Sequence, residues 1–399
     1  MTNKIREVFI VSAVRTPIGA FGGSLSSLTA INLGSEVVKS ALKKINLSGE
    51  QVDEVFFGNV LSAGLGQHPA RQVCLKAGIP KSVPCTSVNK VCSSGLKSVM
   101  IGAQSIMLGD ADLVVCGGME SMSNAPYYLE NNRFNGLKFG DKKIVDGMIK
   151  DGLWDPINDY HMGTAGDLCA KNEGITREEL DDFAVMSYKR SIKARDENLL
   201  DDEITPITIV NRRTKRETVV SKDEELERFN EDKLRQLHPA FDRDFGFCTA
   251  GNSSSLDDGA ACVIIASAEK CKELGLTKIA KIRAFADFAQ EPEKFTTSPT
   301  GAIKKLLKKS NLQVNDIDSW EINEAFAVVP IAVSKQLQIP IEKVNQFGGA
   351  VAYGHPIGCS GARILVTLIN VLKKKGGVTG VAAICNGGGG ASSLLIDLC

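Results

Sequence analysis

The chain has 399 residues, of which 43% are hydrophobic and 24% are charged, so its composition is that of an average globular protein and excludes disorder as its main state. Lysine plus arginine and aspartate plus glutamate each total 47, so the net charge is zero and the basic excess of a nucleic-acid-binding protein is missing. At about 150 residues per domain, this length predicts two or three domains, or one fold used twice.

The first predicted element is an apolar strand over residues 8–14. The residues before it contain neither the apolar stretch of a signal peptide nor an arginine-rich transit segment, and residues 396–399 are not a peroxisomal address. Apolar runs such as 260–266 are far shorter than the roughly 20 residues that cross a bilayer. We therefore expect a cytoplasmic protein with no transmembrane helix and no membrane partner.

Eleven cysteines are scattered along the chain, and no two of them have the CxxC spacing. This distribution argues against a zinc ribbon and against a thioredoxin-like redox motif. We interpret most of these cysteines as small buried hydrophobic side chains and one or two as chemically active.

The segment after Cys92 predicts a helix with one buried face. The apolar side chains that form this face follow i, i+3, i+4 spacing and are interpreted as core: Leu96, Val99, Met100, Ala103, Ile106 and Met107. Cys92 lies where a turn enters the helix. There, free N–H groups and the positive end of the helix dipole favour a thiolate and can bind an oxyanion. A buried structural cysteine is the alternative interpretation.

Residues 122–249 interrupt the alternation of strands and helices and predict an insertion. A capping box at residues 176–179 begins a helix within it. The charged run over residues 222–232 is interpreted, for most of its members, as a solvated face. The strand pattern resumes near residues 260–266. The predicted domains are therefore an N-terminal half (1–121 plus 250–275), an inserted loop domain (122–249) and a C-terminal half (276–399).

Two glycine-rich segments lie in the C-terminal half. Residues 348–361 surround His355 with glycines at the start of a predicted helix, which implies closely packed backbone. A turn histidine is the alternative, because His68 and His238 also precede proline. In the second segment, a strand ends at Cys385 and four glycines follow, at the kind of strand end where α/β sheets bind ligands. A phosphate-cradling loop is less well supported, since the Lys-Ser/Thr ending of a P-loop is missing.

Three pairs of short matches recur at a spacing of about 265 residues, which predicts two copies of one α/β unit. Residues 46–53 resemble 311–318, Ser94-Gly95 matches Ser360-Gly361, and 112–118 resembles 381–387. Chance similarity is the alternative, because each match is short. If the repeat is real, its symmetry brings the helix starts at Cys92 and His355 to one place.

With these segments in view, the chain resembles the thiolase family from about residue 6 to residue 397. The matching motifs are Val11-Ser-Ala-Val-Arg-Thr-Pro-Ile-Gly19, Asn89-Lys-Val-Cys-Ser-Ser-Gly95, Thr249-Ala-Gly-Asn252, Asp258-Gly-Ala260, Asn323-Glu-Ala-Phe326, Gly354-His-Pro-Ile-Gly358 and Cys385-Asn-Gly-Gly-Gly389. The resemblance implies a duplicated thiolase fold, in which two halves form a five-layered αβαβα core with an inserted loop domain.

The resemblance also implies the chemistry of the short-chain, eukaryotic-type acetyl-CoA acetyltransferases of lipid and mevalonate metabolism. That chemistry is a reversible Claisen condensation of two acetyl-CoA molecules to acetoacetyl-CoA. Cys92 would be the acetylated nucleophile, His355 its base, and Cys385 the acid and base at the α-carbon. The N–H groups of Cys92 and Gly387 would form one oxyanion hole, and His355 with a water held by Asn323 would stabilise the enolate.

The binding residues are likewise implied by the resemblance. Those assigned to coenzyme A are Tyr188, Arg228, Phe229, Asn230 and Lys233 at the nucleotide end, Ser254 at the pantetheine and Met162 over the thioester. For Arg228 and Lys233, plain surface charge is the alternative. His161 is interpreted as structural. Potassium activation is implied at Tyr188, Ala250, Gly251, Ser253 and Val351, where Gly251 and Ser253 depart from the usual alanines. No other cofactor is expected. The expected assembly is a homotetramer in which the inserted loop domain contacts neighbouring subunits.

Two other functions compete with this one. The first is a longer-chain 3-ketoacyl-CoA thiolase of β-oxidation, and the second is a non-catalytic relative that binds only CoA or lipid. The joint presence of Cys92, Asn323, His355 and Cys385 argues against the second, since a binding protein needs none of them.

Overall fold

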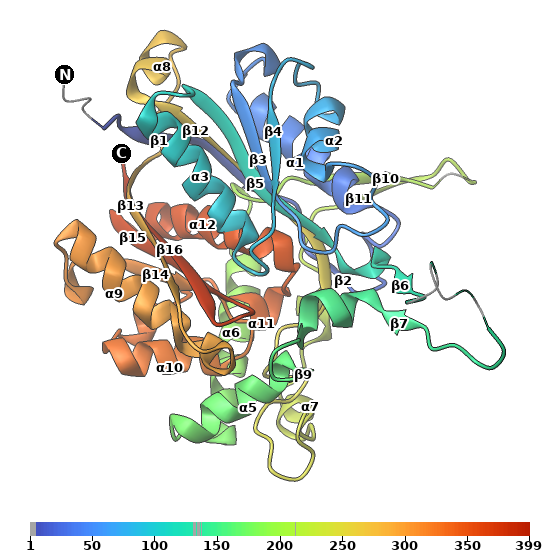
Figure 1. Ribbon diagram of the computed structural model, residues 1–399. Coiled ribbons are helices and arrows are strands. Elements are labelled where there is room, and N and C mark those ends of the chain that lie inside the picture. The colour runs from blue at the N-terminus through green and yellow to red at the C-terminus, as the bar shows by residue number, and fades with distance from the viewer. Residues whose placement is uncertain (1–4, 131–132, 134–135, 137, 212) are drawn as a thin grey trace.

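A computed structural model describes residues 5–130, 133, 136, 138–211 and 213–399 (Figure 1). Residues 1–4 of the predicted N-terminal half, and a few positions of the predicted loop domain, lie outside the described residues. Most strands join in one mixed sheet of order β14-β15-β16-β13-β1-β12-β5-β3-β4, with the short β2 beside β12. Their bounds are β1 Val8–Arg15, β2 Gly19–Ala20, β3 Glu54–Gly58, β4 Cys85–Val88, β5 Leu113–Ser121, β12 Asp257–Ser267, β13 Ala280–Ala289, β14 Ser319–Ile322, β15 Thr379–Asn386 and β16 Gly390–Leu398.

The order of the strands confirms the duplication. From the middle outwards, β1, β12, β5 and β3 of the first half match β13, β16, β15 and β14 of the second. In both halves the outermost of these pairs is parallel and the next two are antiparallel. The two half-sheets are joined by a short antiparallel ladder between β1 and β13, at Phe9 and Ile10. Two similar half-sheets are therefore joined along their inner strands.

Helices cover both faces of these half-sheets and confirm the predicted five layers. Helices α1 and α2 pack on the outer face of the first half, α9 and α10 pack on the outer face of the second, and α3 and α12 lie between the halves (Figure 1). One apolar cluster lies under each outer layer of helices, and a third surrounds the central helices and contacts both half-sheets, as a stack of layers requires. The bounds are α1 Ala30–Lys44, α2 Pro69–Lys76, α3 Ser94–Leu108, α9 Ser298–Ser310, α10 Val328–Leu337 and α12 Ile357–Lys375.

The two central helices cross at the repeated Ser-Gly pairs. A Cβ added to Gly95 would lie 2.7 Å from the backbone nitrogen of Ala362, and one added to Gly361 would collide with the backbone nitrogen of Leu96. Only glycine allows so close an approach of two backbones. The crossing lies next to both helix starts, so the residues just before α3 and α12 meet at one place.

One expectation about α3 needs correction. Val91–Leu108 is long and apolar enough by composition to cross a membrane, with a mean hydropathy of 1.2, although the sequence analysis expected no such stretch. Most of this stretch is buried inside the protein, and its predicted apolar face packs in the central layer, with Met107 only half-buried. Its apolar character is that of a core helix covered on both sides by strands.

The chain between β5 and β12 forms smaller elements around the sheet. They are β6 Tyr127–Tyr128, β7 Val145–Asp146, β8 Trp154–Asp155, β9 Tyr160–His161, α5 Met162–Asn172, α6 Arg177–Asp196, β10 Ile207–Val210, β11 Glu217–Val220 and α7 Glu231–Arg235. The capping box is confirmed, because Thr176 and Glu179 exchange hydrogen bonds at the start of α6. The structure describes these elements without testing the predicted domain boundaries, which stay predictions.

The charged run over residues 222–232 is less solvated than predicted. Lys222, Glu227, Arg228 and Asp232 are exposed. Asp223, however, is buried and accepts two hydrogen bonds from the guanidinium of Arg15, at 2.7 and 2.9 Å. Glu225 is buried as well. The burial of Asp223 depends on Arg15, which lies about two hundred residues away in the sequence, so local composition does not reveal it.

Candidate active site

Cys92 lies in the tight turn between β4 and α3. The preceding residue, Val91, has φ of 48°, a conformation that is rare for a β-branched residue and places the cysteine at an abrupt bend. The Cys92 side chain is half-buried and lines a cavity. Burial raises the pKa of its thiol to about 12, against the opposing effect of two N–H groups, those of Gly387 and of Cys92 itself, that donate to the sulfur. The free thiol is therefore protonated at neutral pH and needs a base.

His355 lies two residues before α12 and supplies an imidazole at the same cavity. Its backbone N–H donates to Asp257 Oδ2 at 2.9 Å. Its ring Nδ1 lies 2.6 Å from the hydroxyl oxygen of Ser360, and that hydroxyl donates its single proton to the carbonyl of Pro356 at 3.0 Å. Ser360 must then accept from Nδ1–H, which leaves the lone pair of the ring on Nε2.

The electrostatics of His355 agree with this tautomer. Burial, together with the positive charge of Arg363, lowers the pKa of the imidazole to about 3, so the ring is neutral at physiological pH. Nε2 is buried and has no hydrogen-bond partner in the part of the chain that the structure describes. A neutral histidine with a free Nε2 facing a cavity can accept a proton from a thiol.

Cys385 and Gly387 lie at the end of β15, as predicted. Cys385 is fully buried, and burial together with the neighbouring Cys92 raises the pKa of its thiol well above the usual range. Gly387 lines the cavity, and a Cβ added there would contact both Val91 and Met162 at 3.7 Å. The two sulfurs are thus close enough for their charges to interact, although they come from opposite halves of the chain.

Asn323 follows β14 and is fully buried. Its backbone N–H donates to the carbonyl of Ala383, two residues before Cys385, at 2.9 Å. Neither Oδ1 nor Nδ2 of its side chain has a hydrogen-bond partner among the described residues. Leaving such a group unpaired typically costs about 1–3 kcal/mol, so its retention indicates a task other than stabilising the fold.

The turn that carries Asn323 is held rigidly. The carboxylate of Glu324 accepts hydrogen bonds from Ser187 Oγ at 2.7 Å, from Asn345 Nδ2 at 2.8 Å and from the backbone N–H of Val351 at 3.0 Å. These contacts connect α6, the segment after α10 and the start of α11 (Ala350–Tyr353) to one carboxylate. The unpaired amide therefore sits on a fixed support.

The cavity lined by Cys92, His355 and Gly387 has a volume of about 390 Å³ and a mostly apolar wall. Of the predicted site residues, the structure brings Cys92, Met162, Ala250, Ser253, Ser254, His355 and Gly387 to its lining. Cys385 and Asn323 lie behind the wall. Other lining residues that the sequence did not single out include Met122, Met148, Ile149, Leu153, Phe241, Leu256 and Phe295. These come from many separate elements, and no local pattern marks them.

Two further residues that sequence analysis missed support His355. Ser360 binds its ring, and Asp257 holds its backbone. Ser360 lies in the quoted glycine-rich segment, so its spacing from His355 on a helix start was a usable signal. His161, interpreted as structural, stacks on Phe241 at 4.8 Å between ring centroids, and its Nδ1 accepts from Gly163 N–H at the start of α5.

The residues predicted to bind the nucleotide end of coenzyme A lie outside the cavity lining. Tyr188 and Phe229 stack with their ring centroids 4.6 Å apart. Arg228 and Lys233 are exposed, and Arg228 forms an ion pair with Glu225 at 2.9 Å. Asn230 caps α7 by accepting from the N–H of Lys233. Gly251, beside the cavity residue Ala250, packs against Leu234 of α7, so this group borders the cavity wall.

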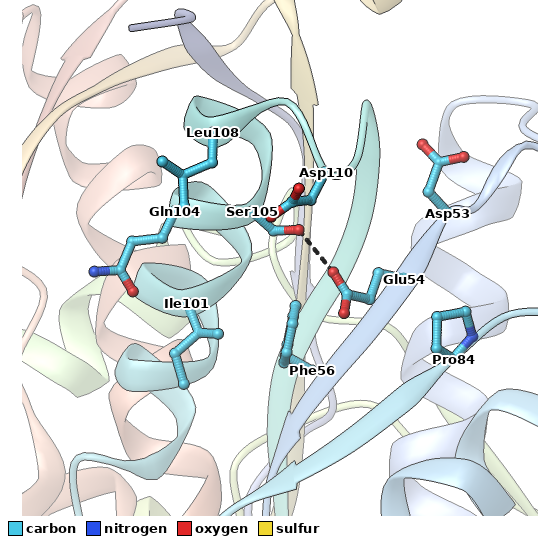
Figure 2. A pocket seen from close by; sticks show the side chains of 9 residues that line it. All are labelled: Asp53, Glu54, Phe56, Pro84, Ile101, Gln104, Ser105, Leu108 and Asp110. Carbon is cyan, nitrogen blue, oxygen red and sulfur yellow. Dashed lines mark hydrogen bonds between the residues drawn. The ribbon is translucent and has the colours of Figure 1, made fainter.

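A second cavity, of about 360 Å³, lies between α3, β3 and the start of β4. Figure 2 shows its wall, where Ser105 donates to Glu54 at 2.7 Å beside Phe56 and Ile101. No cysteine or histidine lines it, and we assign it no part in the chemistry.

Comparison with known proteins agrees with this geometry. Family models of the thiolase N-terminal domain and the thiolase C-terminal domain match residues 8–269 and 276–398. Acetyl-CoA acetyltransferase 2 of Arabidopsis thaliana is 55% identical over 98% of this chain and 97% of its own length. A cytosolic acetyl-CoA acetyltransferase of Gibberella zeae is 50% identical over 98% of both chains. The crystal structure of the Acat5 thiolase from Ascaris suum in complex with coenzyme A has a TM-score of 0.93 and 44% identity, over 99% of this chain and all of that one.

The chain therefore belongs to the thiolase family, and it is an enzyme of the acyl-transferring kind. The predicted fold is confirmed by these matches and by the layers described above.

Proposed function

We propose that this protein is an acetyl-CoA C-acetyltransferase, which condenses two acetyl-CoA molecules to acetoacetyl-CoA and CoA and also catalyses the reverse thiolysis. One observation carries the proposal. A half-buried thiol and a neutral imidazole with a free Nε2 line one apolar cavity, and a second, buried thiol lies close enough to the first for their charges to interact. A protein that only bound CoA would have no use for this combination.

The first half-reaction forms acetyl-Cys92. Nε2 of His355 takes the thiol proton as the sulfur attacks the thioester carbonyl of acetyl-CoA, and the C–S bond to CoA then breaks. The charge that develops on the carbonyl oxygen is bound by the N–H groups of Cys92 and Gly387, which already point towards the sulfur. His355 returns its proton to the departing CoA thiolate.

The second half-reaction forms a carbon–carbon bond. Nε2 of His355 first takes the thiol proton of Cys385, and the resulting thiolate removes a proton from the methyl carbon of a second acetyl-CoA. The resulting enolate needs hydrogen-bond donors because this carbon acid is weaker than a thiol. We assign these donors to the protonated Nε2 of His355 and to a water held by the unpaired amide of Asn323. The enolate carbon attacks acetyl-Cys92, the C–S bond to Cys92 breaks, and the Cys92 thiolate takes the proton from His355 Nε2 as acetoacetyl-CoA is released.

The variant Cys385→Ser separates the two half-reactions. We expect it to form acetyl-Cys92, seen as a mass increase of the intact protein, but to exchange the α-protons of acetyl-CoA poorly. Cys92→Ser should form no acetyl-enzyme. Normal condensation by Cys385→Ser would disprove the role of this cysteine. Rapid loss of activity with iodoacetamide, slowed by acetyl-CoA, should map to Cys92.

The acyl groups handled should be short. A buried cluster of Val60, Leu61, Met122, Met148 and Ile357 packs against Cys92. This packing favours acetoacetyl-CoA over the longer substrates of a β-oxidation thiolase. Thiolysis rates measured with 3-ketoacyl chains of increasing length should fall with each added carbon pair, and higher rates on long chains would overturn the assignment.

For coenzyme A, we assign Met162 and Ser254 to the pantetheine arm, because both line the cavity. Tyr188, Arg228, Phe229, Asn230 and Lys233 are assigned to the nucleotide end. The exposed cations among them suit phosphate groups, and α7 borders the cavity through Gly251. Arg228→Ala with Lys233→Ala should raise the KM for acetyl-CoA and leave kcat unchanged.

We also propose activation by potassium at Tyr188, Ala250, Gly251, Ser253 and Val351. One observation supports the fit of a hard cation, namely that Ser253 Oγ is buried without a partner among the described residues. When bound, the ion would order the loop beside Ser254. Replacing potassium chloride with choline chloride should lower activity and the unfolding temperature together.

The proposed assembly is a homotetramer. Tyr127 on β6 is exposed, as are Phe139 and Ile144 on residues 138–144 before β7, which extend away from the body of the protein (Figure 1). Exposed apolar side chains on one projecting segment favour contacts between subunits. Light scattering should give the mass of four chains, and Phe139→Ser with Ile144→Ser should reduce it. By its similarity to the cytosolic relative, we propose a cytosolic enzyme of lipid and mevalonate metabolism.

A further inference from the structure

A second pair of neighbouring cysteines lies outside the active site. Cys74 is on α2, and Cys85 is the first residue of β4. Both are free thiols, and the S–H of Cys74 donates a hydrogen bond to the sulfur of Cys85. Cys74 is fully buried and Cys85 is half-buried, so an oxidant in solution reaches Cys85 first.

Arg71 gives this pair an electropositive surrounding. One of its guanidinium nitrogens, Nη1, lies 3.8 Å from the sulfur of Cys85. The guanidinium cannot swing away freely, because it also donates to the carbonyls of Val83 at 2.6 Å and Lys81 at 2.5 Å. A fixed positive charge beside a thiol favours the thiolate.

The pKa values of the two thiols shift in opposite directions. The hydrogen bond from Cys74, together with Arg71, lowers the pKa of Cys85 to about 7, although burial and the negative charge of Glu54 act in the other direction. Donating that hydrogen bond raises the pKa of Cys74 well above the usual range. One sulfur is therefore partly ionised at neutral pH while its neighbour keeps its proton.

Other neighbouring thiols do not share these features. Cys116 and Cys262 influence each other's charge, as do Cys169 and Cys248, but all four are buried. Burial raises the pKa of each of these four thiols. In the described part of the chain, the combination of partial exposure, a held arginine and an adjacent protonated thiol is found at Cys85.

We propose that Cys74 and Cys85 are an oxidisable dithiol that forms a reversible disulfide within one chain when the protein meets a hydroperoxide. The contact is local, because α2 packs on β4 and Ser87 Oγ accepts from the N–H of Ala70 at 3.0 Å. Only ten residues lie between the two cysteines along the chain, so the disulfide would close a short loop.

The chemistry takes place in two steps. The thiolate of Cys85 attacks the hydroperoxide, an S–O bond forms, the O–O bond breaks, and the released hydroxide takes a proton to become water. The Cys74 sulfur then loses its proton and attacks Cys85, an S–S bond forms, and the S–O bond breaks to release a second water. Two thiols are oxidised by two electrons, and one hydrogen peroxide is reduced to two waters.

The location gives this modification a route to the active site. Strand β4 ends at Val88 and runs directly into the turn that carries Cys92. The pair is nonetheless separate from the condensation chemistry, because neither thiol lines the catalytic cavity. Oxidation of this pair can therefore be tested without assuming the proposed function.

Tryptic mapping of the oxidised protein tests the proposal. The purified full-length protein is treated with hydrogen peroxide, alkylated and digested without reductant. Cys74 and Cys85 fall on separate tryptic peptides, 72–76 and 82–90, so a disulfide joins two short peptides of defined mass. We expect this linked pair to appear within one chain and to vanish with dithiothreitol. Absence of the linked pair, or its formation between two chains on a non-reducing gel, would overturn the proposal.

Variants assign the roles of the two sulfurs and of Arg71. In Cys74→Ser, sulfenic acid should accumulate at Cys85 and react with dimedone. Arg71→Gln should slow oxidation of Cys85 several-fold, less than the roughly tenfold loss of thiolate in a thiol of ordinary pKa near 8.5, because the hydrogen bond from Cys74 remains. Lys76→Gln is the matched control, since it removes a positive charge from the same helix away from the sulfur. Equal rates in these two charge variants would contradict the role of Arg71.

A measurement on the unaltered protein tests the activation of Cys85 even if the variants fail to fold. The rate at which iodoacetamide labels Cys85, followed by mass spectrometry of peptide 82–90, should rise with pH and level off just above pH 7. Labelling of the exposed Cys399 should continue to rise towards the range of an ordinary thiol. Identical pH profiles for the two cysteines would refute an activated Cys85.

Discussion

The starts of the two central helices hold the same position in the two halves of the protein but carry different chemistry. Before α3, Cys92 is half-buried, and its sulfur is approached by N–H donors. Before α12, His355 is buried, and its ring and backbone are held by Ser360 and Asp257. The duplicated fold accounts for why the two groups meet. The immediate neighbours of each account for why one is the nucleophile and the other is the base.

The largest expected effect comes from removing the nucleophile at the first helix start. Cys92→Ser should lower kcat by at least about 10⁴-fold, because the hydroxyl is a much weaker nucleophile and acid than the thiol. Thermal unfolding should be nearly unchanged, since the two side chains differ little in volume. Turnover in the thiolysis direction measures the first effect and calorimetry the second. Substantial residual activity would place the nucleophile elsewhere.

A smaller loss is expected behind the cavity, at Asn323. Asn323→Ala should lower the rate of condensation about 10²–10³-fold, the usual cost of losing one donor to a developing negative charge. Acetylation of Cys92 should persist. Stability should not fall with activity, because the amide makes no hydrogen bond to the described residues. Asn172→Ala, at an exposed position of α5, is the control. Parallel losses of stability and activity would argue for a structural role.

A variant of Ser360 tests whether this serine sets the tautomer of His355 at the start of α12. Ser360→Ala removes the acceptor of Nδ1–H and lets the proton move to Nε2, so kcat should fall about tenfold while the KM for acetyl-CoA stays constant. Ser334→Ala is a suitable control, since Ser334 is also a buried serine but its hydroxyl has no partner among the described residues. A change in KM alone would show that Ser360 acts on binding and not on the base.

The smallest effect on catalysis is expected from the crossing that brings the halves together. Gly361→Ala forces a Cβ against the backbone of Leu96, which cannot yield as a side chain would, and overpacking of this kind costs about 1–3 kcal/mol. We expect a drop of a few degrees in unfolding temperature and a few-fold loss of kcat/KM. Gln104→Ala, on the exposed face of α3, should change neither. An unaffected Gly361→Ala would show that the helices separate easily.

Much of the fold was accessible from the chain itself. Three local signals correspond to features of the structure. The helical spacing of apolar residues before Leu108 corresponds to α3, the capping box at Thr176 to the start of α6, and the repeated Ser-Gly pairs to the helix crossing. The buried Asp223 was predicted as part of a solvated run, because its partner Arg15 is remote in sequence. The membrane-like hydropathy of Val91–Leu108 was not anticipated, and it reflects burial between the two half-sheets.

What the sequence by itself determined is the set of reactive side chains, because thiols and an imidazole among glycines leave a recognisable local pattern at Cys92, His355 and Cys385. Only the tertiary structure decided their protonation states and the shape of the cavity. Both depend on burial and on groups brought from distant elements, such as Ser360 at the ring of His355 and Arg71 beside Cys85. The pKa of a side chain is set by its whole surroundings, and no single segment of the chain contains those surroundings.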